Sequence, residues 1–490
     1  MKQFLLLAAC YLSLAHSLKS HIDEALEWRD RSIYQVLTDR ILSDGRESLC
    51  KEDLKKYCGG TFRDVQRILP YVKERLGFDA IYISPFVENT EGGYHGYWAK
   101  NFYKVNPHFG TEEDLKQLVQ SAHSLNMNVM VDVVFNHVGY VPEGNDFSDI
   151  VPFNKPDHFH DRCDIQQSDW DTNNRPNIER CRLCGLPDLN TESEDVKRVL
   201  FDWIRDDVIH KYGFDAIRID TVRHINMRFW QELTQVILSD IPVFTLGEVM
   251  NGDINIVSEY QTSGGLDGLM NYPLYYQLVN TFVTGKQSVA TLKDFHISEK
   301  ISFKDLSMIG NFLDNHDVNR VMNQLSGRFK DKSEQRSVLL NMLCYIYLTQ
   351  GIPILYYGTE ALYSGGNDPQ NRETFDPSIA NLDNPVVHYI KTLNDLRREK
   401  HLPDLSIEYR HTEGRFLTMS RGREIYAILS NNQDEIVHET KVVTNHPYEE
   451  GDVLCNAFHE HDCVTIDEGK RMIIKLIQGY PKIYIPFLEI

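Results

Sequence analysis

Short β-rich apolar segments alternate with longer amphipathic segments up to about residue 400 of this 490-residue chain. The segments with the length and composition of buried strands are 32–37, 80–85, 129–135, 214–220, 243–248, 265–270, 308–314 and 353–358. Segments 111–126 and 193–212, which lie between them, carry apolar residues at helical spacing. Eight strand–helix units in succession predict a parallel (β/α)8 barrel. A doubly wound open sheet is the alternative, disfavoured because no GxGxxG turn follows the first strand.

Two regions interrupt this alternation. Residues 139–189 form one long connection rich in Asp, Asn and Pro, and a loop of that length in a compact domain is usually functional or an inserted subdomain. From residue 401 onward the helical pattern stops, and short strands separated by turns predict an all-β C-terminal domain. The expected boundaries are 18–138 with 190–400 for the barrel, 139–189 for the insert, and 401–490 for a C-terminal β-sandwich.

The first 17 residues have the pattern of a secretory signal peptide. Lys2 precedes an apolar run from Phe4 to Ala15, and small residues at Ala15 and Ser17 suit cleavage. The run is short for a membrane span, and the abrupt return of polarity at Lys19 disfavours a buried first helix. A formal net charge of −20 without a basic block disfavours nucleic acid and anionic membranes as partners. The sequence therefore predicts an exported, soluble protein with a neutral substrate.

The nine cysteines fit an oxidising compartment. Besides Cys10 in the N-terminal run, six of them could close three short loops as Cys50–Cys58, Cys163–Cys181 and Cys455–Cys463. Cys184 and Cys344 are left over, and the apolar stretch NMLCYIYL predicts that Cys344 is buried. The CRLC motif at 181–184 has no second CxxC to complete a zinc site.

Polar side chains stand where several of the expected strands end. They are Asp132 with Asn136 and His137, Arg218 with Asp220, Glu248, and Asn315 with His316 and Asp317. In a barrel these strand ends share one face, where active sites form. A single carboxylate there could be a helix N-cap or part of a loop salt bridge. Four carboxylates, two histidines and an arginine on one rim are harder to explain in that way.

Glycoside hydrolysis is a chemistry that uses such a group of carboxylates. It needs one carboxylate as nucleophile and one protonated carboxyl as general acid, and a third could stabilise the positive charge of the transition state. We expect Arg218 to keep Asp220 ionised by charge pairing. The Gly-rich segment GGYHGYW (92–98) offers flat aromatic surfaces for sugar rings, although core packing is an alternative for Tyr94.

These segments resemble the sequence regions of the α-amylase family of glycoside hydrolases. The resemblance lies in VDVVFNH (131–137), FDAIRIDTVRH (214–224), LGEV (246–249), FLDNHD (312–317) and LPDLN (186–190). Further similarity at WRDRSIYQVLTDR (28–40), YCGGTF (57–62), YHGYW (94–98) and GGNDPQNRE (365–373) extends it over nearly the whole chain. The pattern is most similar to that of the fungal-type, secreted α-amylases.

The resemblance implies a role for each site residue. Asp220 would be the nucleophile, Glu248 the general acid/base, and Asp317 the third carboxylate. Substrate contacts are implied for His95, Tyr97, Trp98, His137, Arg218, Arg223, His224, Gly252, His316, Asp368 and Arg372. The chain departs from the family pattern at Arg223, where Lys is frequent, and at Lys55, where fungal relatives often carry a Gln that touches sugar.

The insert resembles the domain B of that family, which a structural Ca²⁺ holds to the barrel. The implied ligands are Asn136, Glu179, Asp188 and the backbone carbonyl of His224, and such oxygen ligands suit calcium. The implied function is that of a monomeric, secreted or secretory-compartment endo-α-amylase acting on starch, glycogen and maltooligosaccharides with retention. The alternatives are an α-glucosidase or transglycosylase of the same fold, and a non-catalytic glucan-binding relative. The last should have lost one of the three carboxylates.

Overall fold

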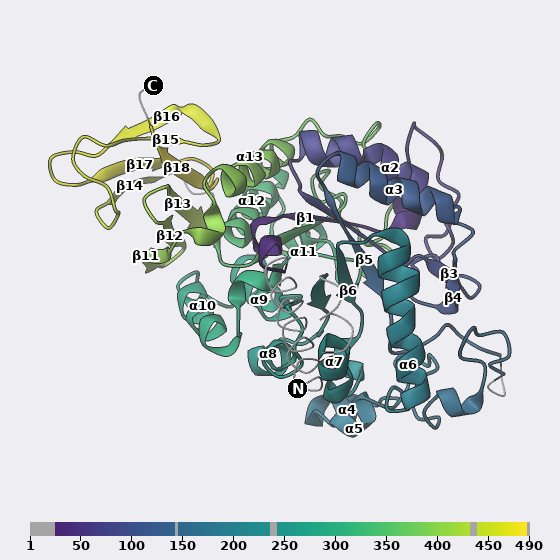
Figure 1. The fold of residues 1–490 in the computed structure, drawn as a ribbon. Helices are drawn as coiled ribbons and strands as arrows, with labels where there is room; N and C mark the ends of the chain where they lie inside the picture. The colour runs from purple at the N-terminus through teal and green to yellow at the C-terminus, as the bar shows by residue number, and fades with distance from the viewer. Residues whose placement is uncertain (1–24, 143–145, 236–242, 432–438, 488–490) are drawn as a thin grey trace, which may run out of the picture.

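Eight parallel strands form the centre of the protein, with helices around them (Figure 1). Their order is β8-β7-β6-β5-β2-β1-β10-β9, and a parallel bridge between Met270 and Gly310 brings the two outer strands together, so the sheet closes into a barrel. The computed structural model describes residues 25–142, 146–235, 243–431 and 439–487. The expected signal peptide and Cys10 lie outside the described residues.

Each of the eight expected segments coincides with one barrel strand to within one residue at its start, or contains it. The strands are β1 (Ile33–Val36), β2 (Ala80–Ile83), β5 (Asn128–Val133), β6 (Ala216–Ile219), β7 (Phe244–Gly247), β8 (Gly268–Leu269), β9 (Gly310–Asn311) and β10 (Ile352–Tyr356). Successive side chains point to opposite faces of the sheet. Met130 and Ala216 therefore belong to a cluster inside the barrel, whereas Val131 and Ile217 pack in the layer beneath the helices. Burial on both faces explains why these strands are continuously apolar.

The helices cover the outside of the barrel (Figure 1). They are α2 (Phe62–Pro70), α3 (Glu112–Ser124), α6 (Glu194–Asp202), α7 (Met227–Leu233), α8 (Ile254–Thr262), α9 (Tyr272–Leu278), α10 (Thr291–Ser302), α11 (Val321–Arg328), α12 (Lys332–Leu348) and α13 (Pro385–Glu399). Shorter or more widely wound turns are η1 (Trp28–Asp30), η2 (Thr38–Arg40), η3 (Tyr71–Arg75), η5 (Trp203–His210), η6 (Val222–His224), η8 (Val279–Val283), η9 (Leu306–Met308) and η10 (Leu402–Asp404). Thr61 and Thr111 form capping boxes that fix the starts of α2 and α3.

The insert lies between β5 and α6. It contains η4 (Pro156–His158), α4 (Gln167–Thr172) and α5 (Arg175–Ile178), so the expectation of a loop-like segment misses three short helices. The Cys163–Cys181 disulfide closes it internally. An antiparallel pair, β3 (Val87–Asn89) and β4 (Ala99–Val105), was also not expected, and a bridge from Asn101 to Val151 joins it to the insert.

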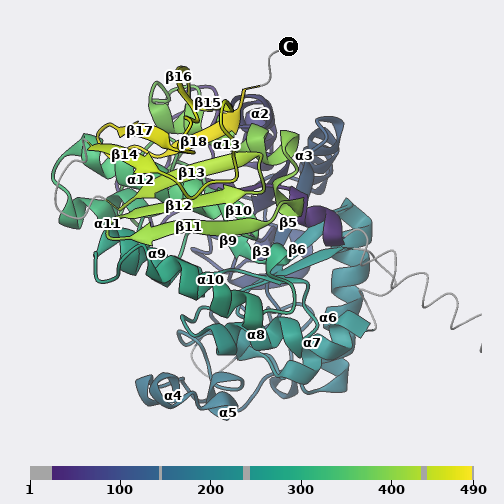
Figure 2. The same ribbon diagram turned by 90° about the vertical axis from the view of Figure 1, so that its left-hand side faces the viewer.

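The C-terminal region is all-β, as expected. An antiparallel sheet contains β11 (Ile407–Glu413), β12 (Phe416–Arg421), β13 (Ile425–Ser430), β18 (Lys482–Pro486), β15 (Val453–Asn456) and β16 (His459–Thr465). A second sheet pairs β14 (Glu439–Val443) with β17 (Met472–Leu476), and residues of both sheets share one apolar cluster, as in a sandwich. These strands and the insert helices α4 and α5 lie at opposite ends of the molecule (Figures 1 and 2).

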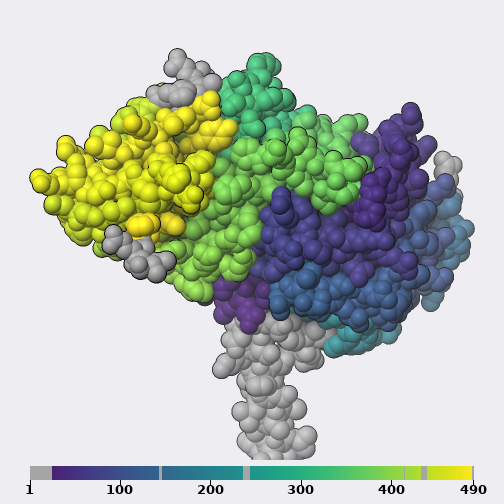
Figure 3. All heavy atoms as spheres, turned by 90° about the horizontal axis from the view of Figure 1, so that it is seen from above, coloured from purple at the N-terminus to yellow at the C-terminus, as the bar shows by residue number. Residues whose placement is uncertain are grey.

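The barrel and the C-terminal sheets form one continuous body (Figure 3). Asn341 of α12 joins them, because it donates to the carbonyl of Gly479 (2.8 Å) and accepts from the N–H of Ser430 (2.7 Å). Within the described ranges, no helix is both long and apolar enough to span a bilayer.

Candidate active site

One buried guanidinium holds three carboxylates at the carboxyl end of the barrel. Arg218 on β6 donates through Nη1 to Asp132 (2.9 Å) and Asp220 (2.8 Å), and its Nη2 lies 3.0 Å from Glu248 Oε1. The parallel register pairs Asp132 with Arg218 across β5 and β6, while Glu248 directly follows β7. Charge-assisted hydrogen bonds of this kind are stronger than hydrogen bonds between neutral groups. The strand that ends in Arg and Asp thus places a cation among the acids of its neighbours.

Asp132 is the anchor of this arrangement. It also accepts hydrogen bonds from the hydroxyls of Tyr82 and Tyr97, both at 2.6 Å. Burial lowers the pKa of Arg218, but Asp132, Glu248 and other neighbours outweigh it and raise that pKa well above the usual value. Arg218 therefore stays charged, and its position is fixed from below by a fully buried carboxylate.

Burial raises the pKa of all three candidate catalytic carboxyls. Burial raises the pKa of Asp220, and the Arg218 charge opposes this shift, which is the direction expected for its pairing with Asp220. The pKa of Glu248 is likewise raised by burial against Arg218. Burial and the Glu248 charge raise the pKa of Asp317 to about 7, while Arg372 and Arg218 oppose them. An upward shift of the pKa is what a carboxyl needs in order to act as a general acid near neutral pH.

Asp317 follows β9 and faces the other side of the rim. Its carboxylate lies 3.1 Å from His316 Nε2 and 3.5 Å from Arg372 Nη2. The hydroxyl of Tyr97 is 2.8 Å from the same His316 nitrogen, and the two rings stack at 5.2 Å. The side chains therefore form a continuous network from Asp317 to Asp132 and Arg218.

A cleft of about 990 Å³ opens above these carboxylates. The expected residues that line it are His95, Tyr97, Trp98, His137, Asp220, Arg223, His224, Glu248, His316, Asp317, Asp368 and Arg372. Arg218 lies beneath the cleft, and Gly252 stands beside Tyr276, which does line it. Sequence reasoning missed the lining residues Tyr140, Gln167, Trp170, Leu183, Cys184, Leu186, Thr221, Met250 and Tyr276. Several of them belong to the insert, whose proximity to the strand ends was the available signal.

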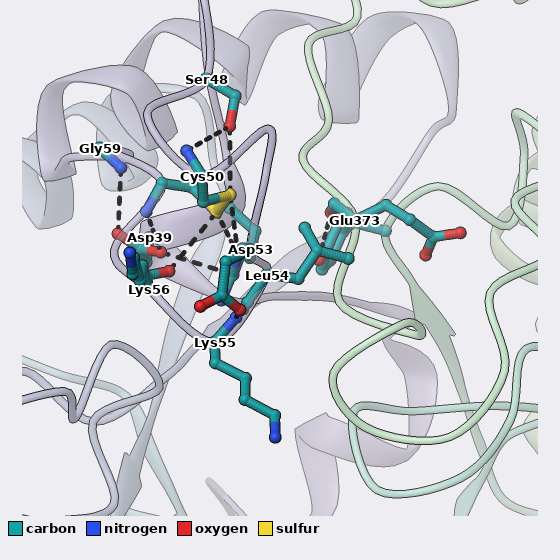
Figure 4. The surroundings of a disulfide bond; sticks show 12 residues. Asp39, Ser48, Cys50, Asp53, Leu54, Lys55, Lys56, Gly59 and Glu373 are labelled. Carbon is teal, nitrogen blue, oxygen red and sulfur yellow. Dashed lines mark hydrogen bonds and ion pairs between the residues drawn. A yellow bond between two sulfur atoms is a disulfide. The ribbon is translucent and has the colours of Figure 1, made fainter.

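The Cys50–Cys58 disulfide, whose surroundings are shown in Figure 4, is linked by side-chain contacts to residues that line the cleft. Arg40 donates to the carbonyl of Leu54 (2.7 Å), contacts both sulfurs of Cys50–Cys58, and lies 3.9 Å over the ring of Tyr94. The Tyr94 hydroxyl in turn accepts from Arg372 Nη1 (3.1 Å) and donates to Asp368 (3.3 Å). Tyr94 is thus a buried packing residue that also holds two lining residues. All three expected disulfides are present, Cys344 is buried, and Cys184 is exposed.

The implied calcium ligands lie where the insert meets the barrel. Leu189 N–H donates to the carbonyl of Asn136 (2.8 Å), and a bridge pairs His137 with Asp188. On the other side of the insert, Ile178 accepts from His224 Nδ1 (3.1 Å), which brings Glu179 close to His224. Within the described part of the chain, no group of three or more His, Cys, Asp or Glu is placed to hold a metal ion. The implied ligand set contains only two carboxylates, Glu179 and Asp188.

One oxygen of this set has no hydrogen-bond partner. Asp188 is buried, and its Oδ1 receives no hydrogen bond within the described structure, whereas its Oδ2 is 2.7 Å from His160 Nδ1. An unsatisfied buried anionic oxygen requires an explanation, and a cation supplies one. A carboxylate oxygen of this kind is a ligand type that Ca²⁺ prefers. His160, which sequence reasoning missed, also lies 2.5 Å from Glu192; burial lowers its pKa, but these two acids outweigh it and raise the value to about 9.

Paired carboxylates at the mouth of a (β/α)8 barrel define a site of the glycoside-hydrolase type. The comparisons agree with this class, since the model of the α-amylase catalytic domain matches residues 35–386. The chain belongs to the α-amylase family of glycoside hydrolases. It is 33% identical over 475 residues to an α-amylase of Saccharomycopsis fibuligera, covering 94% of this chain and 92% of that protein.

Solved structures give the same result. An α-amylase from Malbranchea cinnamomea has a TM-score of 0.84 and 32% identity, with 94% of this chain and 97% of that chain covered. An α-amylase from Geobacillus thermoleovorans, solved with acarbose, has a TM-score of 0.81 and 32% identity over 94% and 99% of the two chains. The expected family and fold are confirmed.

Proposed function

We propose that this protein is an endo-acting α-amylase that hydrolyses internal α-1,4-glucosidic bonds of starch and glycogen with retention of configuration. The observation that carries the proposal is the pair Asp220 and Glu248, both on Arg218 at the floor of the cleft. In the first step Glu248 protonates the glycosidic oxygen while Asp220 attacks the anomeric carbon, which breaks the bond and forms a glycosyl ester. In the second step Glu248 takes a proton from water, which attacks the same carbon and releases Asp220.

The histidines of the cleft suit a neutral, hydroxyl-rich substrate. Burial lowers the pKa of His137 to about 4 and that of His224 to about 3. It also lowers the pKa values of His95 and His316 well below the usual value. Neutral imidazole has one donor and one acceptor nitrogen, as a sugar hydroxyl requires. Tyr97 and Trp98 add aromatic surface beside them.

The alternative functions differ from an endo-α-amylase in which part of the glucan chain, or which acceptor, occupies each end of the cleft. An α-glucosidase or transglycosylase would share the same carboxylates, and a non-catalytic relative would lack one of them. The cleft has a volume of about 990 Å³ and is lined by Asp368 and Arg372 as well as by Trp170 and Leu186 of the insert, and this size supports binding within a chain rather than at its end. The test is the product series from soluble starch. Mixed oligosaccharides from the first minutes are expected, and glucose alone would contradict endo-action.

We further propose a structural Ca²⁺ held by Asn136, Glu179, Asp188 and the carbonyl of His224. The unsatisfied Oδ1 of Asp188 supports it. The ion would neutralise the carboxylates and fix the insert to the barrel beside His137. Secretion is proposed from the N-terminal pattern and the three disulfides, which are typical of exported proteins. A monomeric state is proposed as well.

Removing the first disulfide should weaken substrate binding. In a Cys50→Ser/Cys58→Ser variant, Arg40 and Tyr94 lose their support, so we expect KM for maltoheptaose to rise several-fold with little change in kcat. Loss of this disulfide, whose cysteines are 8 residues apart in sequence, should also lower the free energy of unfolding by roughly 2–3 kcal/mol. Steady-state kinetics and urea unfolding measure both effects.

The control for this prediction is Cys455→Ser/Cys463→Ser. That disulfide has the same sequence separation of 8 and lies in the C-terminal sheet, away from the cleft. It should lose similar stability without a change in KM. Equal KM values for the two double variants would contradict the link from the first disulfide to Arg372.

A further inference from the structure

A buried tyrosine contacts the proposed acid/base. Tyr272, the first residue of α9, is fully buried, and its hydroxyl donates to Glu248 Oε1 at 3.2 Å. The same hydroxyl oxygen accepts from Asn315 Nδ2 at 3.1 Å. Because Asn315 provides the donor there, the single proton of the phenol is directed to Glu248. Burial and the Glu248 charge raise the pKa of Tyr272 well above its usual value, so the phenol remains a donor.

The start of α9 is rigidly placed. Asn271, its N-cap, accepts from Leu274 N–H and donates to Glu299 and to Asn311, each at 2.8 Å. The Tyr272 ring packs edge-on against Phe312, with the ring centroids 5.0 Å apart. The hydroxyl therefore has a fixed position relative to β7 and β9, and a phenylalanine would keep the ring contact while losing only the hydrogen bond.

The two oxygens of Glu248 are held differently. Oε1 receives Tyr272 and faces the Arg218 guanidinium at 3.0 Å, so both of its lone-pair positions are occupied. Oε2 receives a single donor, the backbone N–H of Thr221 at 3.0 Å. Thr221 adopts a left-handed conformation (φ 51°), unusual for a β-branched residue, and such strain is typical of functional positions.

We propose that Tyr272 is a positioning residue that reserves Oε1 of Glu248 as an acceptor, so that Oε2 is the oxygen that carries and transfers the catalytic proton. This inference rests on the proposed function. In the first step the Oε2–H bond breaks and the proton passes to the glycosidic oxygen as the C1–O bond breaks. In the second step a proton returns from water to Oε2.

Asn315 extends the arrangement to the third carboxylate. Its Oδ1 accepts the backbone N–H of Asp317 at 2.8 Å, while its Nδ2 holds Tyr272. Glu248 and Asp317 are thereby connected through two neutral side chains. A displacement of Asn315 would disturb the phenol and the loop that carries Asp317 together.

The hydrogen bond from Tyr272 stabilises the ionised form of Glu248 and lowers its pKa. Arg218 and the N–H of Thr221 also lower the pKa of Glu248, whereas the charge of Asp220 raises it. Asp317 and His137 are the other titratable groups that interact with Glu248. Without the phenol, Glu248 should keep its proton to higher pH. The alkaline limb of the pH profile reports the last proton lost by the Glu248–Asp317 pair, so this limb should move.

The test is the pH dependence of kcat/KM for maltoheptaose in Tyr272→Phe. We expect the alkaline limb to move to higher pH, the acid limb to stay, kcat at the optimum to fall about tenfold because the acid is less well oriented, and KM to change less than twofold. Asn315→Ala should move the same limb in the same direction by less. Tyr275→Phe is the matched control: this buried phenol on the same helix meets Gln324 and not Glu248, and its profile should match the wild type.

A profile of Tyr272→Phe with an unmoved alkaline limb, in protein whose melting temperature is near that of the wild type, would overturn the inference. So would equal shifts in Tyr272→Phe and Tyr275→Phe. Failure of the proposed function has a different signature, because Glu248→Gln would then retain turnover whatever Tyr272→Phe does.

Discussion

Asp220→Asn should reduce kcat on maltoheptaose by at least about 10⁴-fold, because it removes the nucleophile on which the glycosyl ester forms. Glu248→Gln should reduce it by roughly 10²- to 10⁴-fold, the usual contribution of a general acid/base. Both replacements are nearly isosteric and buried, so the loss should come without a change in circular dichroism. Steady-state kinetics on the purified variants measures it.

Asp314→Asn is the control for these two variants. Asp314 is a buried carboxylate at the same end of the barrel, but it accepts from Val321 N–H (3.0 Å) and Thr359 (3.0 Å) and does not line the cleft. Its replacement should cost some stability and leave kcat near the wild-type value. Substantial turnover in Asp220→Asn or Glu248→Gln would show that the role of that residue is misassigned.

Calcium removal should have the next largest effect. Excess EGTA is expected to lower the melting temperature by several degrees and to abolish activity reversibly, because an ion bound only by the folded state stabilises it by about 2.7 kcal/mol at 100 times its Kd. Without the ion the insert would lose its attachment beside His137, and its ordering entropy would no longer be offset. Asp188→Ala should reproduce the effect without EGTA.

Glu192→Gln is the control that distinguishes the effect of the calcium ion from the effect of the neighbouring ion pairs. It weakens the contact with His160 (2.5 Å) and leaves the proposed ligands intact, so this variant should still bind calcium and still respond to EGTA. An unchanged melting curve in EGTA, together with elemental analysis that finds no calcium in the protein, would remove the metal from the account and leave the catalytic proposal standing.

The fold could be predicted from sequence because each barrel strand is a short, doubly buried apolar run between amphipathic helices. The polar strand ends grouped Asp132, Asp220, Glu248 and Asp317, since parallel strands share one carboxyl face. The resemblance to the α-amylase family then implied catalytic roles for the last three. The cysteine pairs could be predicted because each closes a short loop. These features are local in sequence, and the barrel topology brings them together.

The remaining features depend on contacts between distant segments. Tyr272, Tyr275 and Tyr276 are indistinguishable in sequence, and only the position of α9 selects Tyr272 for Glu248. His160 meets Asp188 from 28 residues away through the path of the insert. The net shift of Asp220 could not be predicted either, because burial outweighs Arg218 and burial depends on the whole cleft.

The central claim is that Asp220 and Glu248 act as nucleophile and acid/base in a retaining cleavage of α-1,4-glucans. Proton NMR of maltoheptaose during the first minutes of digestion tests it most directly, because the anomeric signals of new reducing ends appear before mutarotation mixes them. We expect α-anomers on oligosaccharides of several lengths. New reducing ends that appear first as β-anomers would contradict it.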